Sequence, residues 1–225
     1  ADTGLGKTAM QVEWAKLVCE KTNGNVLILA PLCVAQQTVE EGAKFGININ
    51  FCRKQENIVC GINITNYEQM HNFDFSTFSG VVLDESSILK SYTGKTKQAL
   101  IEQCSSIPYR LACTATPSPN DYLELGNHAE FLGIMPSNEM IMRFFINDTM
   151  SAGDYRLKGH SVVPFWDWVA SWAMCISSPA DIGFDGSNHV LPSLNQEFCI
   201  IDVSDLPTND GELFRSVEMS ATNIH

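Results

Sequence analysis

The sequence has few positive charges. It holds 14 Lys and Arg residues against 26 Asp and Glu residues, a formal net charge of −12. Proteins that bind nucleic acid tightly usually carry a basic surface patch. The charge balance therefore argues against tight nucleic-acid binding by these 225 residues alone.

Long apolar runs and paired cysteines are also missing. No run approaches the roughly 20 apolar residues that cross a bilayer, and no signal peptide is visible, so we expect no membrane partner and a cytoplasmic location. The 8 cysteines form no C-x-x-C pair, which predicts reduced, mostly buried thiols and no zinc site. The apolar content of 44% is typical of a globular chain.

Short apolar runs alternate with polar helical stretches from residue 1 to about residue 133. This alternation is typical of βαβ units and predicts an α/β fold with a mostly parallel sheet. We expect strands at 26–30, 62–65, 81–83 and 110–114. We expect helices at 8–21, 34–44, 95–103 and 120–131.

The pattern changes after Gly133. Ser137 is expected to cap a helix that runs through Ile146, followed by a polar turn at 147–159. Phe165, Trp168 and Trp172 then recur at helical spacing, which indicates a buried face rather than a base-stacking platform. We expect three parts: a nucleotide-binding lobe at 1–133, a helical extension at 134–190, and a linker leading into a strand at 191–225.

The first eight residues fit the phosphate-loop (Walker A) pattern G-x-x-x-x-G-K-[ST], with Ala1 in the place of the first glycine. The two later glycines let the backbone wrap around phosphate, and the helix that follows adds the positive end of its dipole. Lys7 can reach the β- and γ-phosphates of ATP, and the Thr8 hydroxyl can bind Mg²⁺. We assign phosphate binding to Gly4, Leu5, Gly6, Lys7 and Thr8. A second Gly-Lys-Thr at 94–96 lacks a preceding strand and is interpreted as a turn before a helix.

Two adjacent acids, Asp84 and Glu85, follow a buried strand. Ligands gather at the carboxyl ends of strands in an open parallel sheet, so these acids should lie near the phosphate loop. Asp84 is the candidate magnesium ligand, and Glu85 is the candidate base for the attacking water. Because successive strand side chains point in opposite directions, the two roles require Glu85 to lie on the turn past the strand.

Five ordered motifs resemble those of superfamily 2 helicases, and especially of the SNF2-like ATPases. Lys7 and Thr8 match motif I. The other matches are LAPL at 29–32 for motif Ia, ITNYE at 64–68 for Ib, DESSILK at 84–90 for II, and TATPSPN at 114–120 followed by LEL at 123–125 for III. RLKGH at 156–160 and LPSL at 191–194 look like segments of helicase-like proteins of phages and prophages.

The resemblance implies the first RecA-like lobe of a helicase or translocase, a three-layer αβα lobe that binds ATP and Mg²⁺. It implies catalytic roles for Lys7 and Glu85, and nucleic-acid or coupling roles for Pro31, Thr65, Thr114 and Thr116. DNA is favoured over RNA, in a bacterial or phage-infected cell. Ser86 and Ser87 depart from the small residue and His or Asp usual in motif II.

We also expect the chain to be a fragment, cut inside motif I and lacking the second lobe that carries the arginine finger. Without that arginine, hydrolysis by residues 1–225 should be very slow. Two other functions remain open: an ATPase subunit of a restriction or remodelling complex without unwinding, and a nucleotide-binding scaffold.

Overall fold

The computed structural model describes residues 1–90, 94–118, 120–147, 155–189 and 195–196. The chain divides into two units, Ala1–His189 and Val190–His225, and all the described helices and strands belong to the first. The strand expected after residue 191 lies outside the described residues. Among the helices described, none combines the length and apolar character needed to cross a membrane.

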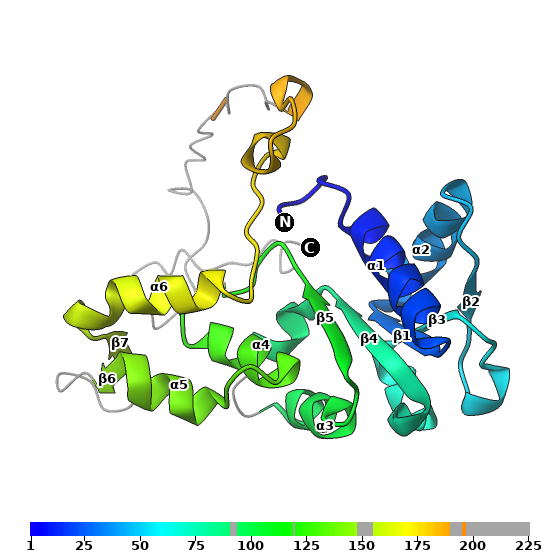
Figure 1. Ribbon diagram of the computed structural model, residues 1–225, viewed down its shortest axis with the longest axis horizontal. Helices are drawn as coiled ribbons and strands as arrows, with labels where there is room; N and C mark the ends of the chain where they lie inside the picture. Colours follow the sequence, from blue (N-terminus) through cyan, green and yellow to red (C-terminus); the bar gives the residue numbers. More distant parts are fainter. Residues whose placement is uncertain (91–93, 119, 148–154, 190–194, 197–225) are drawn as a thin grey trace, which may run out of the picture. The chain divides into compact units, whose positions relative to one another are not determined.

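A five-stranded parallel sheet forms the centre of the first unit (Figure 1). Its spatial order is β2-β3-β1-β4-β5. The strands are β1 (Asn25–Ala30), β2 (Ile49–Phe51), β3 (Ile62–Asn66), β4 (Phe78–Asp84) and β5 (Tyr109–Cys113). The four expected strands are confirmed. Three are longer than expected, β5 begins and ends one residue earlier, and β2 is an additional short edge strand.

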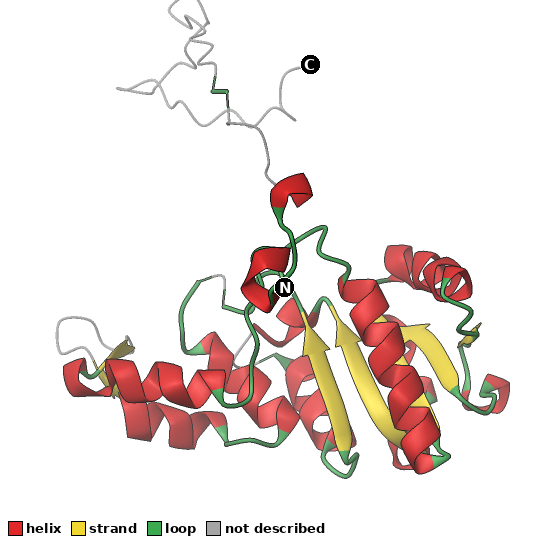
Figure 2. Cartoon of the chain, turned by 45° about the horizontal axis from the view of Figure 1, so that its top comes forward, coloured by secondary structure: helices red, strands yellow, loops and turns green. Residues whose placement is uncertain are grey.

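Helices cover both faces of the sheet (Figure 2). Helices α1 (Lys7–Thr22) and α2 (Leu32–Lys44) pack on one face, where they meet Val26 and Ile28 of β1. Helices α3 (Lys95–Cys104) and α4 (Glu124–Leu132) pack on the other face, where they meet Leu27 and Leu29. Because β1 is buried on both faces, its sequence is a continuous apolar run, as is usual for a central parallel strand.

Short 3-10 helices connect these elements: η1 (Gln55–Asn57), η2 (Tyr67–Asn72), η3 (Phe75–Thr77), η4 (Ser86–Lys90), η5 (Gly159–Ser161), η6 (Pro179–Ile182) and η7 (Ser187–His189). Helix α4 begins at Glu124, four residues later than expected. The reason is a turn in which Asn120 Nδ2 donates to Glu124 Oε1 and Leu123 N donates to Asp121 Oδ1. Such side-chain bonds compete with helix formation.

A smaller cluster follows α4. Helix α5 (Ser137–Phe144), helix α6 (Val162–Ala170) and the antiparallel hairpin of β6 (Phe145–Asn147) and β7 (Tyr155–Leu157) enclose a core around Phe165, which is fully buried. Partly buried Trp168 packs on this core, as the helical spacing predicted.

Two expectations about the helix in this cluster were wrong, and the polar turn expected at 147–159 contains strand β7. The helix ends at Phe144 instead of Ile146, because the chain then pairs with β7. Ser137 is the first helical residue and Pro136 is the N-cap; the Ser137 hydroxyl donates to Glu130 Oε2 at 2.7 Å.

Candidate nucleotide-binding site

The carboxyl ends of the strands form one edge of the sheet, and α1 begins beside it (Figure 2). The register places Thr65 and Leu83 level with Leu29 of the central strand, and Asp84 level with Cys113. The residues predicted from motifs Ia, Ib, II and III therefore share this edge, although they are far apart in the sequence.

The opening loop has the backbone that the phosphate-loop pattern requires. Gly4 and Gly6 have φ angles of +78° and +73°, which side-chain-bearing residues rarely adopt. A Cβ atom at either position would meet nothing within 4 Å, so the glycines are needed for backbone conformation rather than for packing space. Leu5 connects them, and the space beside both is open.

Helix α1 starts at Lys7 without a side-chain cap and without an acid in its first turn. Its first N–H groups therefore remain available to an anion, and the helix dipole favours one there. Lys7 Nζ donates to the carbonyl oxygens of Ala1 and Asp2, at 3.2 and 3.1 Å. The ammonium thus lies within the loop, on neutral acceptors that phosphate oxygens could replace. Thr8 follows in the same first turn.

Asp84 is the last residue of β4 and is only 5% exposed. Its Oδ1 accepts from Gln11 Nε2 at 2.6 Å and from the Glu85 N–H at 3.1 Å. The Tyr67 hydroxyl donates to the Asp84 carbonyl oxygen at 2.7 Å. Burial, with the charges of Asp84 and Glu85 added, raises the pKa of Tyr67 well above its usual value, so Tyr67 remains a proton donor.

Glu85 lies on the turn beyond the strand. This position is the one expected if Asp84 binds magnesium and Glu85 acts as the base. Its φ is +51°, the left-handed region that a residue with a side chain rarely occupies. The side chain therefore leaves the strand's alternating pattern. Thr114 Oγ1 donates to Glu85 Oε2 at 3.3 Å and accepts from the Thr116 N–H at 3.0 Å. Glu85 is thus in contact with the loop that follows β5.

The bond between Gln11 and Asp84 connects helix α1, which follows the opening loop, to the acidic turn formed by Asp84 and Glu85. Gln11 lies one helical turn after Lys7, on the same side of α1. Burial raises the pKa of the nearby Cys113 thiol to about 11, and the charges of Asp84 and Lys7 act on it in opposite directions. Both charged groups therefore lie around one half-buried thiol at the end of β5.

The other predicted residues differ in exposure. Thr116 is exposed, and Pro31 is half-buried as the N-cap of α2. Thr65 is fully buried, and its hydroxyl has no partner among the described residues. Thr114 is 8% exposed and bonded to Glu85. Among these four residues, Thr116 and Pro31 are accessible to a large ligand. Thr114 instead links the loop after β5 to Glu85.

A magnesium ion fits the oxygen donors present. Mg²⁺ is usually held by one or two carboxylates together with substrate phosphates and water. Within the described residues, no group of three or more His, Cys, Asp or Glu side chains could hold a metal alone. The Thr8 hydroxyl and Asp84 Oδ2 take part in no described hydrogen bond, so both remain available as ligands.

Three residues at this site were not predicted from the sequence: Gln11, Tyr67 and His128. Tyr67 belongs to the ITNYE segment at 64–68 that was matched to motif Ib. Gln11 could have been found from its helical spacing after Lys7. His128 bonds to Ser86 from 42 positions away, and no local pattern marks it.

Comparison with solved structures identifies the fold. The SWI2/SNF2 ATPase core of Sulfolobus solfataricus, in complex with dsDNA, is 24% identical with a TM-score of 0.52; the match covers 64% of this chain and 33% of that one. The UvsW helicase of bacteriophage T4 is 14% identical (TM-score 0.49, 60% and 51% covered), and the Hef helicase domain of Pyrococcus furiosus is 19% identical (0.49, 59% and 32%). No protein-family model and no curated protein matches the sequence.

The described residues form a three-layer α/β lobe, as expected. More particularly, the lobe shares its fold with part of the SWI2/SNF2 ATPase core, and it spans about a third of the length of that chain.

Proposed function

We propose that this chain is the first ATP-binding lobe of a nucleic-acid-dependent ATPase that translocates on DNA. One observation carries the proposal: the 2.6 Å bond from Gln11 to Asp84 joins the helix that follows the phosphate loop to the acidic turn. A triphosphate bound at Lys7 would therefore meet both Asp84 and Glu85.

Each residue has a role in this proposal. Gly4, Leu5 and Gly6 present backbone N–H groups to the phosphates, and Lys7 neutralises their charge. Thr8 and Asp84 would hold Mg²⁺, which would offset the charge that develops on the phosphate groups. Glu85 orients the attacking water and accepts its proton.

The contact between Thr114 and Glu85 supports a coupling role for the loop after β5. In the proposed cycle, a change at the γ-phosphate reaches Thr114 through Glu85 and then the exposed Thr116. Thr116 and Pro31 would contact the nucleic-acid backbone, which fixes position rather than reading sequence. The dsDNA in the SWI2/SNF2 core structure favours a duplex as the partner.

Hydrolysis of ATP should be measured in the longest natural chain that contains these residues, with and without duplex DNA. We expect DNA to stimulate hydrolysis, and Glu85→Gln to abolish turnover while nucleotide binding is kept. Lys7→Ala should weaken both. If Glu85→Gln leaves turnover unchanged, Glu85 is not the base.

Two further outcomes separate the alternatives. Nucleotide binding with no turnover, with or without DNA, would favour a scaffold. DNA-stimulated turnover without strand displacement would favour a translocase, or an ATPase subunit of a restriction or remodelling complex, over a strand-separating helicase.

A further inference from the structure

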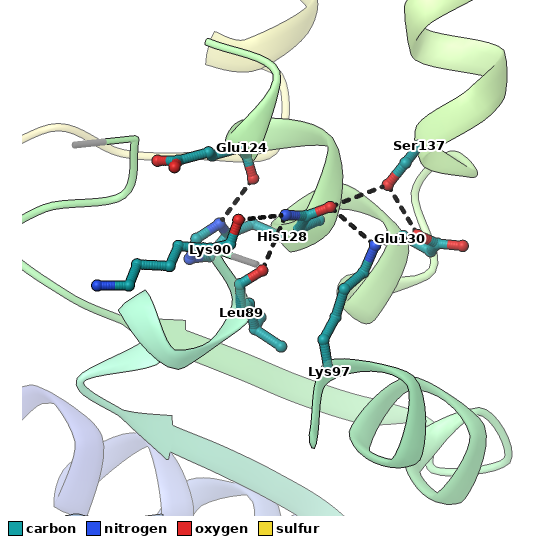
Figure 3. A network of polar contacts seen from close by, with 8 residues as sticks. Leu89, Lys90, Lys97, Glu124, His128, Glu130 and Ser137 are labelled. Atoms are coloured by element: carbon teal, nitrogen blue, oxygen red, sulfur yellow. Dashed lines mark hydrogen bonds and ion pairs between the residues drawn. The ribbon is translucent and has the colours of Figure 1, made fainter. Parts of the chain in front are cut away.

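A buried hydrogen bond joins the acidic turn to helix α4. Ser86 Oγ lies 3.1 Å from His128 Nε2, and the two residues are 0% and 4% exposed. The other ring nitrogen, His128 Nδ1, lies 3.4 Å from the Glu124 carbonyl oxygen (Figure 3). Because a carbonyl oxygen only accepts, we assign the ring proton to Nδ1, which leaves Nε2 to accept the hydroxyl proton of Ser86.

The far end of η4 is bound to the same helix. Asn127 Nδ2 donates to the carbonyl oxygens of Leu89 and Lys90, at 2.8 and 3.2 Å. Asn127 Oδ1 in turn accepts from Lys97 Nζ at 2.8 Å, and Lys97 lies 3.3 Å from Glu130 (Figure 3). Two adjacent residues of α4 therefore hold both ends of the segment that follows Glu85.

Glu85 needs such support because of its backbone. A side-chain-bearing residue at φ +51° persists only where its surroundings impose that conformation. Gln11 and Tyr67 fix the residue before it, through the side chain and the carbonyl of Asp84. The residue after it, Ser86, has no side-chain bond in the described structure other than that to His128.

We propose that His128 is a positioning residue, which through Ser86 sets the orientation of the Glu85 carboxylate towards the attacking water. This inference rests on the proposed ATPase function and deepens it. An apolar pair in place of Ser86 and His128 would fill the same space. It would not hold the backbone after Glu85 in one conformation. A buried, fully satisfied polar contact fixes one geometry.

The first test compares Ser86→Ala, His128→Phe and the double variant in the longest natural chain. We expect each single variant to lower kcat for ATP hydrolysis about 10-fold, because small displacements of a catalytic group are costly. KM for ATP should stay within about 2-fold, because the phosphate loop is untouched. The double variant should be no slower than the slower single one, and His128→Gln, which keeps an acceptor, should recover part of the rate.

A second test measures the turn directly, independently of catalysis. Amide hydrogen exchange of residues 85–90 should be faster in Ser86→Ala and in His128→Phe than in the unaltered chain. His71→Gln and Ser105→Ala are matched controls, because both side chains are exposed and far in sequence from the turn. Neither control should change kcat or exchange.

The outcomes distinguish the two proposals. If Glu85→Gln stops turnover but Ser86→Ala and His128→Phe do not slow it, the positioning role is wrong and the ATPase function stands. A double variant whose loss equals the product of the single losses would also overturn it, as would unchanged exchange at 85–90. If Glu85→Gln has no effect on turnover, the proposed function fails instead.

Discussion

Gln11 is the most informative single residue at the sheet edge. Its amide is completely buried, and one of its two polar atoms, Oε1, has no hydrogen-bond partner in the part of the chain that the structure describes. Burying an amide costs free energy unless its bonds repay it. The short bond to the Asp84 carboxylate supplies that compensation, because hydrogen bonds to charged groups are among the stronger ones.

Gln11→Leu should therefore weaken magnesium-dependent nucleotide binding. A leucine of similar size keeps the packing but removes the donor that orients Asp84. We expect roughly 10-fold lower affinity for ATP with Mg²⁺ and a smaller change without it. Isothermal titration calorimetry with and without Mg²⁺ measures both. Gln36→Leu, on the exposed side of α2, is the control and should change neither. Equal losses with and without Mg²⁺ would contradict the link to Asp84.

His128 makes the stability of the lobe depend on pH. Burial lowers the pKa of His128 below its ordinary value of 6.5. The unfolded chain therefore binds a proton more readily than the folded one, and folding stability rises with pH in that range. The contribution is complete above about pH 6.5, where the unfolded histidine is neutral, and declines as the pH falls towards the folded pKa.

Urea unfolding at several pH values between 8 and 5 checks this dependence, with His128→Gln as the reference that cannot titrate. The free energy of unfolding of the unaltered protein, minus that of the variant, should shrink as the pH falls. A difference that is constant or grows on acidification would contradict the assignment.

The local motifs could be predicted because each is formed by residues that are neighbours in the sequence. Two glycines before Lys7 predicted the loop. Two adjacent acids at the end of a buried strand predicted the turn, with Glu85 past the strand. The residues that hold the acidic turn by hydrogen bonds could not be predicted from the sequence. Gln11 reaches Asp84 across 73 positions, and a single sequence carries no signal for a contact that only the fold creates.

At the scale of elements, α4 is connected to the acidic turn by a buried polar network. Lys97 of α3 is 5% exposed and lies between Asn127 and Glu130 of α4, while Ser137 of α5 donates to Glu130 (Figure 3). Three helices thus meet on charged and polar side chains, of which Lys97, Asn127 and Ser137 are buried and Glu130 is partly exposed. Such networks tolerate the loss of one member poorly, because the remaining groups stay buried.

Lys97→Met should destabilise the protein by about 2 kcal/mol, since it leaves Asn127 and Glu130 without this partner. Lys16→Met is the matched control. Lys16 pairs with Glu13 at the same 3.3 Å, but both side chains are about half exposed. Exposed pairs contribute little, so the control should stay within about 0.5 kcal/mol. Chemical denaturation measures both, and similar losses in the two variants would show that burial does not matter here.

The elements that the sequence predicted well carry a local signal: β1 is a continuous apolar run, and α1 follows a glycine-rich loop. The errors occurred where side chains or distant strands decide the structure. Ser137 was predicted to be a helix cap, but its hydroxyl donates a hydrogen bond to Glu130. The strand β6 was read as the end of a helix, because its partner β7 lies later in the sequence. Edge strand β2 has only three residues, too few to show a pattern.

At the scale of the whole molecule, the net charge of −12 opposes a nucleic-acid ligand. Each phosphate contact gains affinity mainly when a Lys or Arg displaces a counterion, and an acidic surface repels the backbone instead. The groups proposed to touch the backbone, at Pro31 and Thr116, are uncharged. They can fix the register of a bound strand but supply little long-range attraction.

Residues 1–225 alone should therefore bind duplex DNA weakly, with a dissociation constant above about 10 µM at physiological salt. The salt dependence should be shallow, because few cations take part in the contact. Fluorescence anisotropy of a labelled duplex over a range of salt concentrations measures both quantities. The longest natural chain should bind more tightly and with a steeper salt dependence, if its remaining residues supply the basic surface. Submicromolar, steeply salt-dependent binding by residues 1–225 would place the basic surface on this lobe. It would contradict the weak binding predicted from the net charge.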